Sequence, residues 1–287
     1  KLVIAVGIIS LFSINLYQGS QARASEVFLL KFLIASQSAV MWMNVLFILA
    51  MLTYWFALFK RSTFVENAAS SLTWIAVLMG FVGLMVRWYE SYLIAPEVGH
   101  IPISNLYEVF ILFCLITALL YLHYEKKFNT KQLGGFVLLV INAGVGFILW
   151  YTFDRQAQGI QPLVPALQSY WMKIHVPANF VGYGAFAISA MIAFGYLIKQ
   201  QASETRWYKL TPLLMLGVIL CFMPLVFRKT TLEAGGSYWL GYLTISALIV
   251  GGILWGRHRI AARLPSFEVM DDVMYKSIAV GFAFFTI

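Results

Sequence analysis

His175 is the side chain in this sequence whose type and setting best suit chemistry at a metal centre. It lies in the segment SYWMKIHVP, where an apolar run begins, and Tyr170 and Trp171 precede it. Asn179 and Tyr183 follow within the next eight positions. An imidazole at a membrane surface with aromatic neighbours suits axial ligation of haem iron. On the residues alone, a structural role for His175 at the start of a helix stays open.

The other three histidines fit architectural roles. His258 lies in the basic turn RHR, and His123 lies near the end of an apolar run, where the carbonyl end of a helix favours a cation. His100 follows Gly99 in a polar segment, where loop packing and ligation both stay open. No histidine lies in the middle of an apolar run, which disfavours a bundle with haem held between facing mid-helix histidines.

Familiar cofactor motifs are missing from the sequence. Its two cysteines, Cys114 and Cys221, lie in separate apolar runs and form no C-x-x-C. A disulfide framework, a zinc site and a covalently attached c-type haem are therefore not expected. The sequence also lacks a Walker A motif, so a nucleotide-driven pump is not supported.

A second chemically dense stretch is the 87–110 segment, RWYESYLIAPEVGHIPISNLYEVF. It carries several charged or titratable side chains: Arg87, Glu90, Glu97, His100 and Glu108. Irregular backbone cannot lie in hydrocarbon, so we expect an ordered excursion at one membrane face or a segment buried in protein. Charged groups at that boundary are candidates for function, and an ordinary connecting loop is the alternative. Ser104 or Asn105 is the expected N-cap of a helix over 107–124.

The composition indicates a membrane protein. Of the 287 residues, 61% are hydrophobic and 11% are charged, far from the balance of a soluble domain. We expect an all-α fold, a polytopic transmembrane bundle of about seven to nine helices. The net charge of +8 fits basic loops on one membrane face, so a nucleic-acid partner is not expected.

Apolar runs place the expected spans. They cover 39–59, 71–86, 107–124, 133–153, 176–198, 211–227 and 238–256, with a last one starting near Ser277. Residues 2–17 are expected to form a first membrane or interfacial helix, although a signal peptide would also fit. Residues 27–37 are expected to form an interfacial helix or an early start to the next helix. We therefore divide the chain into an N-terminal membrane or interfacial segment, 1–37, and a transmembrane domain, 38–287.

Lysines and arginines predict the orientation. With the first clear span ending inside, the inside loops hold twelve of these residues and the outside loops hold five. The 87–110 segment, the 154–174 loop and the end of the last helix then lie outside.

The 87–110 segment and the later KIHVPANFVGYGAFAISA closely resemble the CcsA component (also ResC or CcsB) of system II cytochrome c biogenesis. This is a haem-handling family related to CcmC and CcmF. The resemblance runs from about Ser36 to Ile287. The family's external tryptophan-rich WWD motif is absent. Because the sequence from Ser266 to Ile287 resembles the helix that precedes that motif, we expect the chain to stop before it.

The resemblance implies particular roles for the candidate residues. His175 matches the first of two external histidines that ligate haem in the family, with Trp171 and Tyr183 expected near the haem. Asn105 and Glu108 match an S-N-x-Y-E signature, and His100 and Glu90 are expected to be architectural neighbours. The second external histidine and a transmembrane histidine would follow Ile287.

The resemblance also implies the biology of the complex. Haem b would be the substrate, held transiently at a site facing the periplasm of a bacterial inner membrane. The chain would act with a ResB-type (CcsB-type) membrane partner as the synthase component that attaches haem to the CxxCH of apocytochrome c. A small-solute transporter with broken helices and a structural subunit of a respiratory complex remain the alternatives.

Overall fold

The computed structural model describes residues 1–60, 62–163, 165, 168–203 and 236–286, and its regular structure there is entirely helical. The helices are α1 (Leu2–Tyr17), α2 (Arg23–Glu26), α3 (Ser36–Phe59), α4 (Thr63–Ile94), α5 (Leu106–Phe128), α6 (Gly134–Arg155), α7 (Met172–Ser203), α9 (Gly236–Ala261) and α10 (Phe267–Phe285). A short π-helix (Leu30–Ile34) and a 3-10 helix (Lys131–Leu133) join some of them. The all-α prediction is confirmed for these residues.

Five of the described helices, α3 to α7, are long and apolar enough to cross a membrane, and α1 is a shorter apolar helix. The chain is therefore a multi-pass membrane protein. The expected total of seven to nine spanning helices stays a prediction. The span expected over 211–227 lies outside the described residues.

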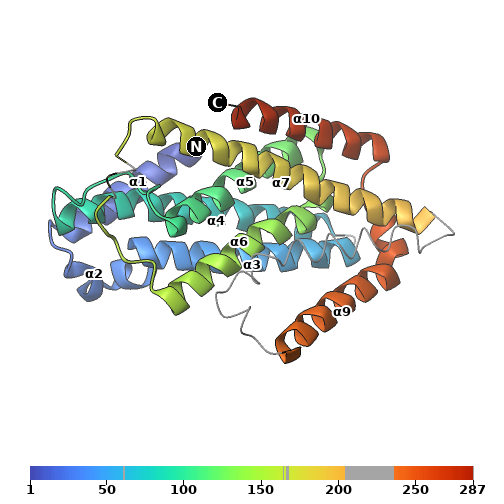
Figure 1. Ribbon diagram of the computed structural model, residues 1–287, viewed down its shortest axis with the longest axis horizontal. Helices are drawn as coiled ribbons and strands as arrows, with labels where there is room; N and C mark the ends of the chain where they lie inside the picture. Colours follow the sequence, from blue (N-terminus) through green and yellow to red (C-terminus); the bar gives the residue numbers. More distant parts are fainter. Residues whose placement is uncertain (61, 164, 166–167, 204–235, 287) are drawn as a thin grey trace.

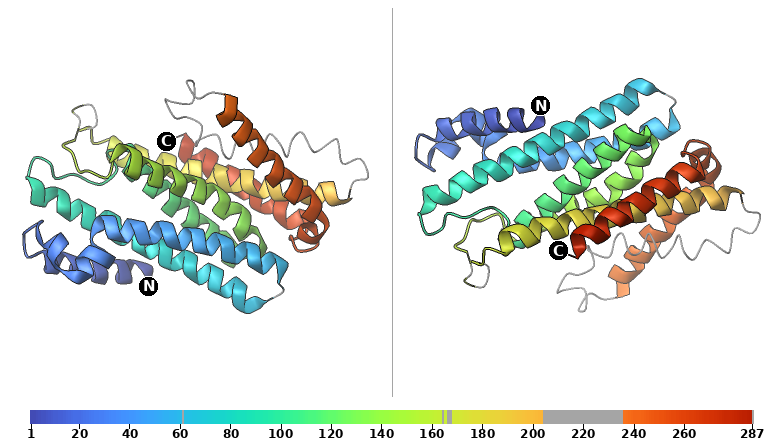
Figure 2. Two further views of the ribbon diagram at one scale, coloured as in Figure 1. Left: turned by 90° about the horizontal axis from the view of Figure 1, so that it is seen from below. Right: turned by 90° about the horizontal axis from the view of Figure 1, so that it is seen from above.

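Helices α3 to α7 form the bundle, α1 lies along α4, and α10 lies along α7 (Figures 1 and 2). Helices α3, α5 and α7 begin at one end of the bundle, where α4 and α6 end; we call this the His175 end. Helix α10 runs antiparallel to α7, so its last residues approach that end. The division between 1–37 and 38–287 stays a prediction.

A glycine allows a close contact between α3 and α4. A Cβ atom on Gly83 would lie 2.9 Å from a methyl of Val40 and 3.2 Å from the carbonyl oxygen of Ser36. Small residues at such crossings let the backbones approach, which is the main source of packing energy between helices in lipid. This contact fixes the start of α3 against the last turns of α4.

The expected end of the second span at residue 86 was wrong. Helix α4 continues to Ile94, so Arg87 and Glu90 are helical and not part of a loop. The helix can carry these charges because Glu108 neutralises Arg87, and Tyr17 and Ser36 donate hydrogen bonds to Glu90, as described below. It ends at Ala95, whose extended backbone is the conformation favoured before a proline such as Pro96.

Other boundaries also differ from the expectations. Helix α4 begins at Thr63, eight residues before the expected start at 71. Helix α10 begins at Phe267, ten residues before Ser277, because the Ser266 hydroxyl caps it by accepting from the backbone N–H of Val269. Residues 27–37 are not one continuous helix, because the π-helix ends at Ile34 and α3 starts at Ser36.

Candidate functional site

A buried ion pair ties two helices together at the His175 end. The Nε atom of Arg87, on α4, donates to Oε1 of Glu108, on α5, at 2.7 Å. Only 4% and 2% of these side chains are exposed. The guanidinium also lies over the ring of Tyr107, 5.3 Å from its centroid. Because both charges are desolvated, each requires the other to remain in place.

Glu108 also helps to start its own helix. Asn105 is the N-cap of α5, since its Oδ1 accepts from the backbone N–H of Glu108 at 2.9 Å. In return, Oε2 of Glu108 accepts from the backbone N–H and the hydroxyl of Ser104, both at 2.8 Å. The arrangement is a variant of the capping box, and it confirms Asn105 as the predicted cap.

Arg87 extends this contact to the loop that leads to His175. Its Nη1 donates to the carbonyl oxygen of Gln158 at 2.7 Å, and its Nη2 donates to that of Gly159 at 3.4 Å. One guanidinium thus binds α4, the start of α5 and the loop between α6 and α7. Gln158 and Gly159 are therefore anchored to the bundle by Arg87, whose charge is neutralised by Glu108.

Glu90 makes a comparable link one turn from Arg87 along α4. Its carboxylate accepts from the hydroxyls of Tyr17 and Ser36 and, at 3.1 Å, from the backbone N–H of Ser36. Ser36 is the first residue of α3, so the carboxylate lies at the positive end of that helix. Glu90 therefore joins α1, α3 and α4, a structural role that agrees with its expected place among the architectural residues.

His100 has partners on both ring nitrogens. Nδ1 lies 2.6 Å from the carbonyl oxygen of Val98, and Nε2 lies 2.6 Å from the hydroxyl of Ser104. Both contacts are within the 87–110 segment, so the ring braces the connection between α4 and α5. The arrangement favours loop packing over ligation.

His175 is the contrasting case. It lies in the first turns of α7 with an exposed side chain, and its backbone N–H donates to the carbonyl oxygen of Trp171 at 2.8 Å. The side-chain amide nitrogen of Asn179, one turn further along, lies 2.7 Å from Nε2. In the tautomer in which Nε2 accepts from the amide, the N–H of the ring is on Nδ1. His175 is thus an accessible imidazole held by a neighbour that an incoming ligand can displace.

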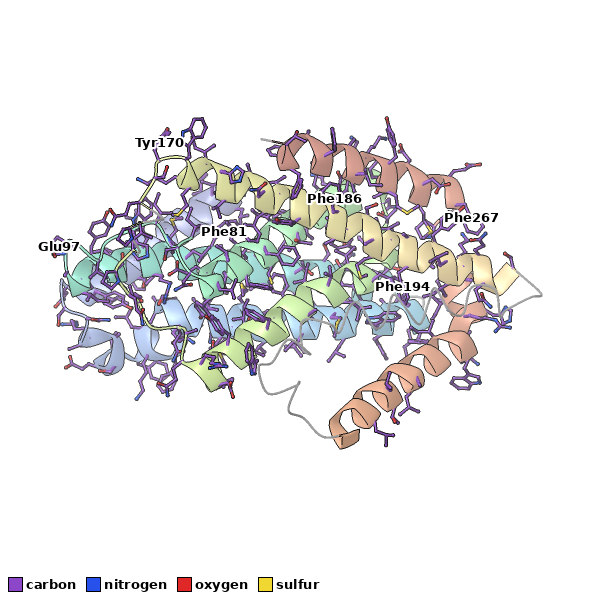
Figure 3. All side chains as sticks on the ribbon, viewed as in Figure 1. Phe81, Glu97, Tyr170, Phe186, Phe194 and Phe267 are labelled. Carbon is purple, nitrogen blue, oxygen red and sulfur yellow. The ribbon has the colours of Figure 1, made fainter. Side chains whose placement is uncertain are left out.

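The aromatic residues expected near His175 divide into two groups. The rings of Tyr170 and Trp171 are 70% exposed, and Figure 3 shows Tyr170 projecting from the bundle at the same end as Glu97. Tyr183 packs edge-on against Phe285 of α10, with ring centroids 5.4 Å apart. The structure therefore places the end of α10 beside the face of α7 that continues to His175.

The structure unites some of the candidate residues and separates others. Arg87, Asn105, Glu108 and His100 form one connected network, whereas His175 belongs to a separate surface at the same end of the bundle. Across the described residues, no three histidine, cysteine, aspartate or glutamate side chains gather as a metal site. His175 would therefore provide a single ligand from this part of the chain.

Sequence reasoning missed two of the partners. Tyr17 and Ser36 were not expected to meet Glu90, because nothing in the local sequence links residues so far apart. A buried carboxylate at a membrane boundary was the available signal that such donors exist.

Comparisons with known proteins identify relatives of this chain. The family described as cytochrome c assembly protein matches residues 103–287. The chain is 27% identical over 206 residues to "Cytochrome c biogenesis protein CcsA" of Chlorella vulgaris, covering 71% of this chain and 56% of that protein. Proteins of the same name from Gloeobacter violaceus and Microcystis aeruginosa are 26% and 28% identical, over 82% and 83% of this chain.

The match to these relatives is partial in length. The chain covers 67% of the Gloeobacter protein and 69% of the Microcystis protein, against 56% of the Chlorella protein. No solved structure matches. Since the family match covers more than half of the sequence, including both Glu108 and His175, the chain belongs to the cytochrome c assembly protein family.

Proposed function

We propose that this protein presents haem for covalent attachment to apocytochrome c, with His175 as one axial ligand of the iron. The observation that carries the proposal is the exposed imidazole of His175 at the start of α7, within the segment shared with the family. Haem is the substrate here, held until its vinyl groups react. The outer membrane face, a periplasmic location and a ResB-type partner belong to the same proposal.

The site geometry suits reversible ligation. His175 is accessible, and among the described residues its side-chain partner is the amide of Asn179 rather than a carboxylate, so displacing that partner costs little. An imidazole nitrogen provides a lone pair for iron. Trp171, just before α7, and Tyr183, within α7, provide aromatic surface for the porphyrin.

The chemistry of attachment requires a fixed porphyrin with an open edge. Two axial imidazoles hold the iron and define the plane of the ring, while the vinyl groups remain at the periphery. Thiols of a C-x-x-C-H segment then add across the vinyl double bonds to give thioethers. In this proposal, the chain contributes by orienting the substrate through His175.

Haem content of the natural full-length protein, purified with its membrane partner, tests the proposal. We expect His175→Ala to lower haem occupancy at least several-fold and to reduce cytochrome c maturation in cells. Imidazole added to the growth medium should restore part of both, because it replaces the missing ligand. His258→Ala is the matched control, since His258 is also exposed but lies at the end of α9.

The possible results separate ligation from structure. Lost maturation without imidazole rescue, together with unchanged haem spectra, would mean that His175 is structural. A fully matured cytochrome c pool in His175→Ala cells would refute the proposed role of His175 as a haem ligand.

A further inference from the structure

The first turn of α7, residues 172–176, carries His175 and is set apart from the rest of the helix by a proline. Pro177 is the one proline inside an α-helix among the described residues. A proline has no backbone N–H, so the carbonyl oxygen of Lys173, four residues earlier, has no donor in the helical pattern. The first turn is therefore joined to the rest of α7 by one backbone hydrogen bond fewer than a regular helix provides.

A simple signal for the start of the helix is the competing explanation for Pro177. Proline is common at the first position of a helix, where its missing N–H would have no partner in any case. Pro177 lies five residues after Met172, the first residue of α7, and there a regular helix uses the N–H. The proline thus removes a bond that alanine would make at the same position, and helices bend most readily at such a gap.

The first turn of α7 is only lightly packed. Its residues 173–175 have exposed side chains, and its other two residues are partly buried against the core. The buried residues of α7 begin at Gly182, more than one turn after the proline. Segments with few buried apolar contacts open at a low cost in free energy. The first turn can therefore change its direction while the remainder of α7 stays packed in the bundle.

A side-chain contact spans the proline. The amide nitrogen of Asn179 lies 2.7 Å from Nε2 of His175, so the contact joins residues on either side of Pro177. The backbone N–H groups of residues 172–175 donate to carbonyl oxygens of residues 169–171, which ties the turn to the preceding loop. A hydrogen bond between neutral groups contributes about 0.5–1.5 kcal/mol. The amide can therefore hold the turn without a ligand and yield to one that binds more strongly.

We propose that Pro177 and Asn179 are positioning residues for His175. The proline is a hinge on which the first turn of α7 changes direction, and the amide is a latch that holds the turn while no haem is bound. This inference rests on the proposed role of His175 as an axial ligand. When Nε2 gives its lone pair to iron, the amide of Asn179 loses its acceptor and the turn moves with the imidazole. When haem leaves, the amide recovers Nε2.

Electron paramagnetic resonance of a nitroxide label tests the hinge in the natural full-length protein with its membrane partner, without haem and with the native cysteines replaced by serine. The label is attached at Lys173→Cys in the first turn. The matched reference is Ala190→Cys, an exposed position on the same helix after the proline. We expect a mobile component at position 173 that is absent at position 190. Pro177→Ala should reduce this component about fivefold, the factor that one restored hydrogen bond contributes, and Asn179→Ala should increase it by a similar factor.

Haem added to the same labelled proteins tests the coupling to ligation. Haem should remove the mobile component at position 173, because iron then holds the imidazole, and should leave the spectrum at position 190 unchanged. In Pro177→Ala, haem binding followed by stopped-flow absorbance should be about fivefold slower, because the stiffer turn keeps the latch closed.

The possible results separate the hinge from the ligand role of His175. Equal mobility at positions 173 and 190, or a label at position 173 that Pro177→Ala does not affect, would overturn the hinge. A spectrum at position 173 that does not respond to haem would overturn the coupling. The mobility measured without haem does not depend on iron ligation, so loss of the hinge and loss of the proposed role of His175 are recognised separately.

Discussion

The buried pair between Arg87 and Glu108 gives the sharpest prediction for stability. Glu108→Gln removes one charge and leaves the guanidinium of Arg87 desolvated. Because both side chains are almost fully buried, breaking the pair should cost about 3–5 kcal/mol. Arg87→Met should cost a similar amount plus about 1 kcal/mol for each loop carbonyl that loses its donor, at Gln158 and Gly159.

The double variant decides whether the two residues act as a pair. If they do, Arg87→Met with Glu108→Gln should be at least as stable as Arg87→Met alone, because no unpaired charge remains. The coupling free energy should then be at least the cost of Glu108→Gln alone, about 3 kcal/mol or more. The measurement is the unfolding midpoint of the purified protein in detergent, followed by circular dichroism and repeated at high salt. Salt should leave the coupling unchanged because the pair is shielded from solvent.

A matched exposed pair serves as the control. Lys276 and Asp272 are four residues apart on α10, with 40% and 43% of their side chains exposed. Breaking this pair should cost no more than about 0.5 kcal/mol. Additive effects of Arg87→Met and Glu108→Gln, with a coupling near that of the exposed pair, would refute the view that the buried pair organises the His175 end.

Three further predictions concern other contacts. Glu90→Ala removes the acceptor of three hydrogen bonds and should lower the free energy of unfolding by about 3 kcal/mol or more, measured by the same melting assay. Gly281→Leu should lower the melting midpoint, because a Cβ at this position would lie 2.8 Å from an aromatic ring of α7, and the expected cost is about 1–3 kcal/mol. Gly251→Leu is the control and should leave the midpoint unchanged, because a Cβ at Gly251 meets nothing within 4 Å. Asn179→Ala frees Nε2 of His175 and should speed haem binding in stopped-flow absorbance, whereas a slower rate would show that the amide holds the imidazole in its productive orientation.

Much of the architecture followed from apolar runs, since the spans expected over 39–59, 107–124, 133–153 and 176–198 correspond to α3, α5, α6 and α7. The error at residue 86 arose because charge was taken to end a span. Arg87 remains in α4 because Glu108, far along the chain, provides its counter-charge. A hydropathy scale gives the cost of placing each residue in the membrane by itself. The observed end of α4 depends instead on an ion-pair partner of Arg87 that only the tertiary structure provides.

In the candidate site, too, local contacts were predictable from the sequence and contacts between distant segments were not. Asn105 was predictable as a cap because its partner is three residues away, and the contact depends on local geometry alone. The hydrogen bonds from Tyr17 and Ser36 to Glu90 were not predictable from local sequence, because they join three separate helices. His175 was singled out by its setting and by resemblance, and its role as an iron ligand stays a prediction.

The packing of α10 on α7 bears on the predicted role of His175 as an iron ligand. Gly182 of α7 lies close to the carbonyl oxygen of Gly281 and to Phe285, so the two helices cross without side chains to hold them apart. His175 is seven residues before Gly182, about 10 Å along the axis of α7. The end of α10 is therefore directed toward the surface on which His175 is exposed.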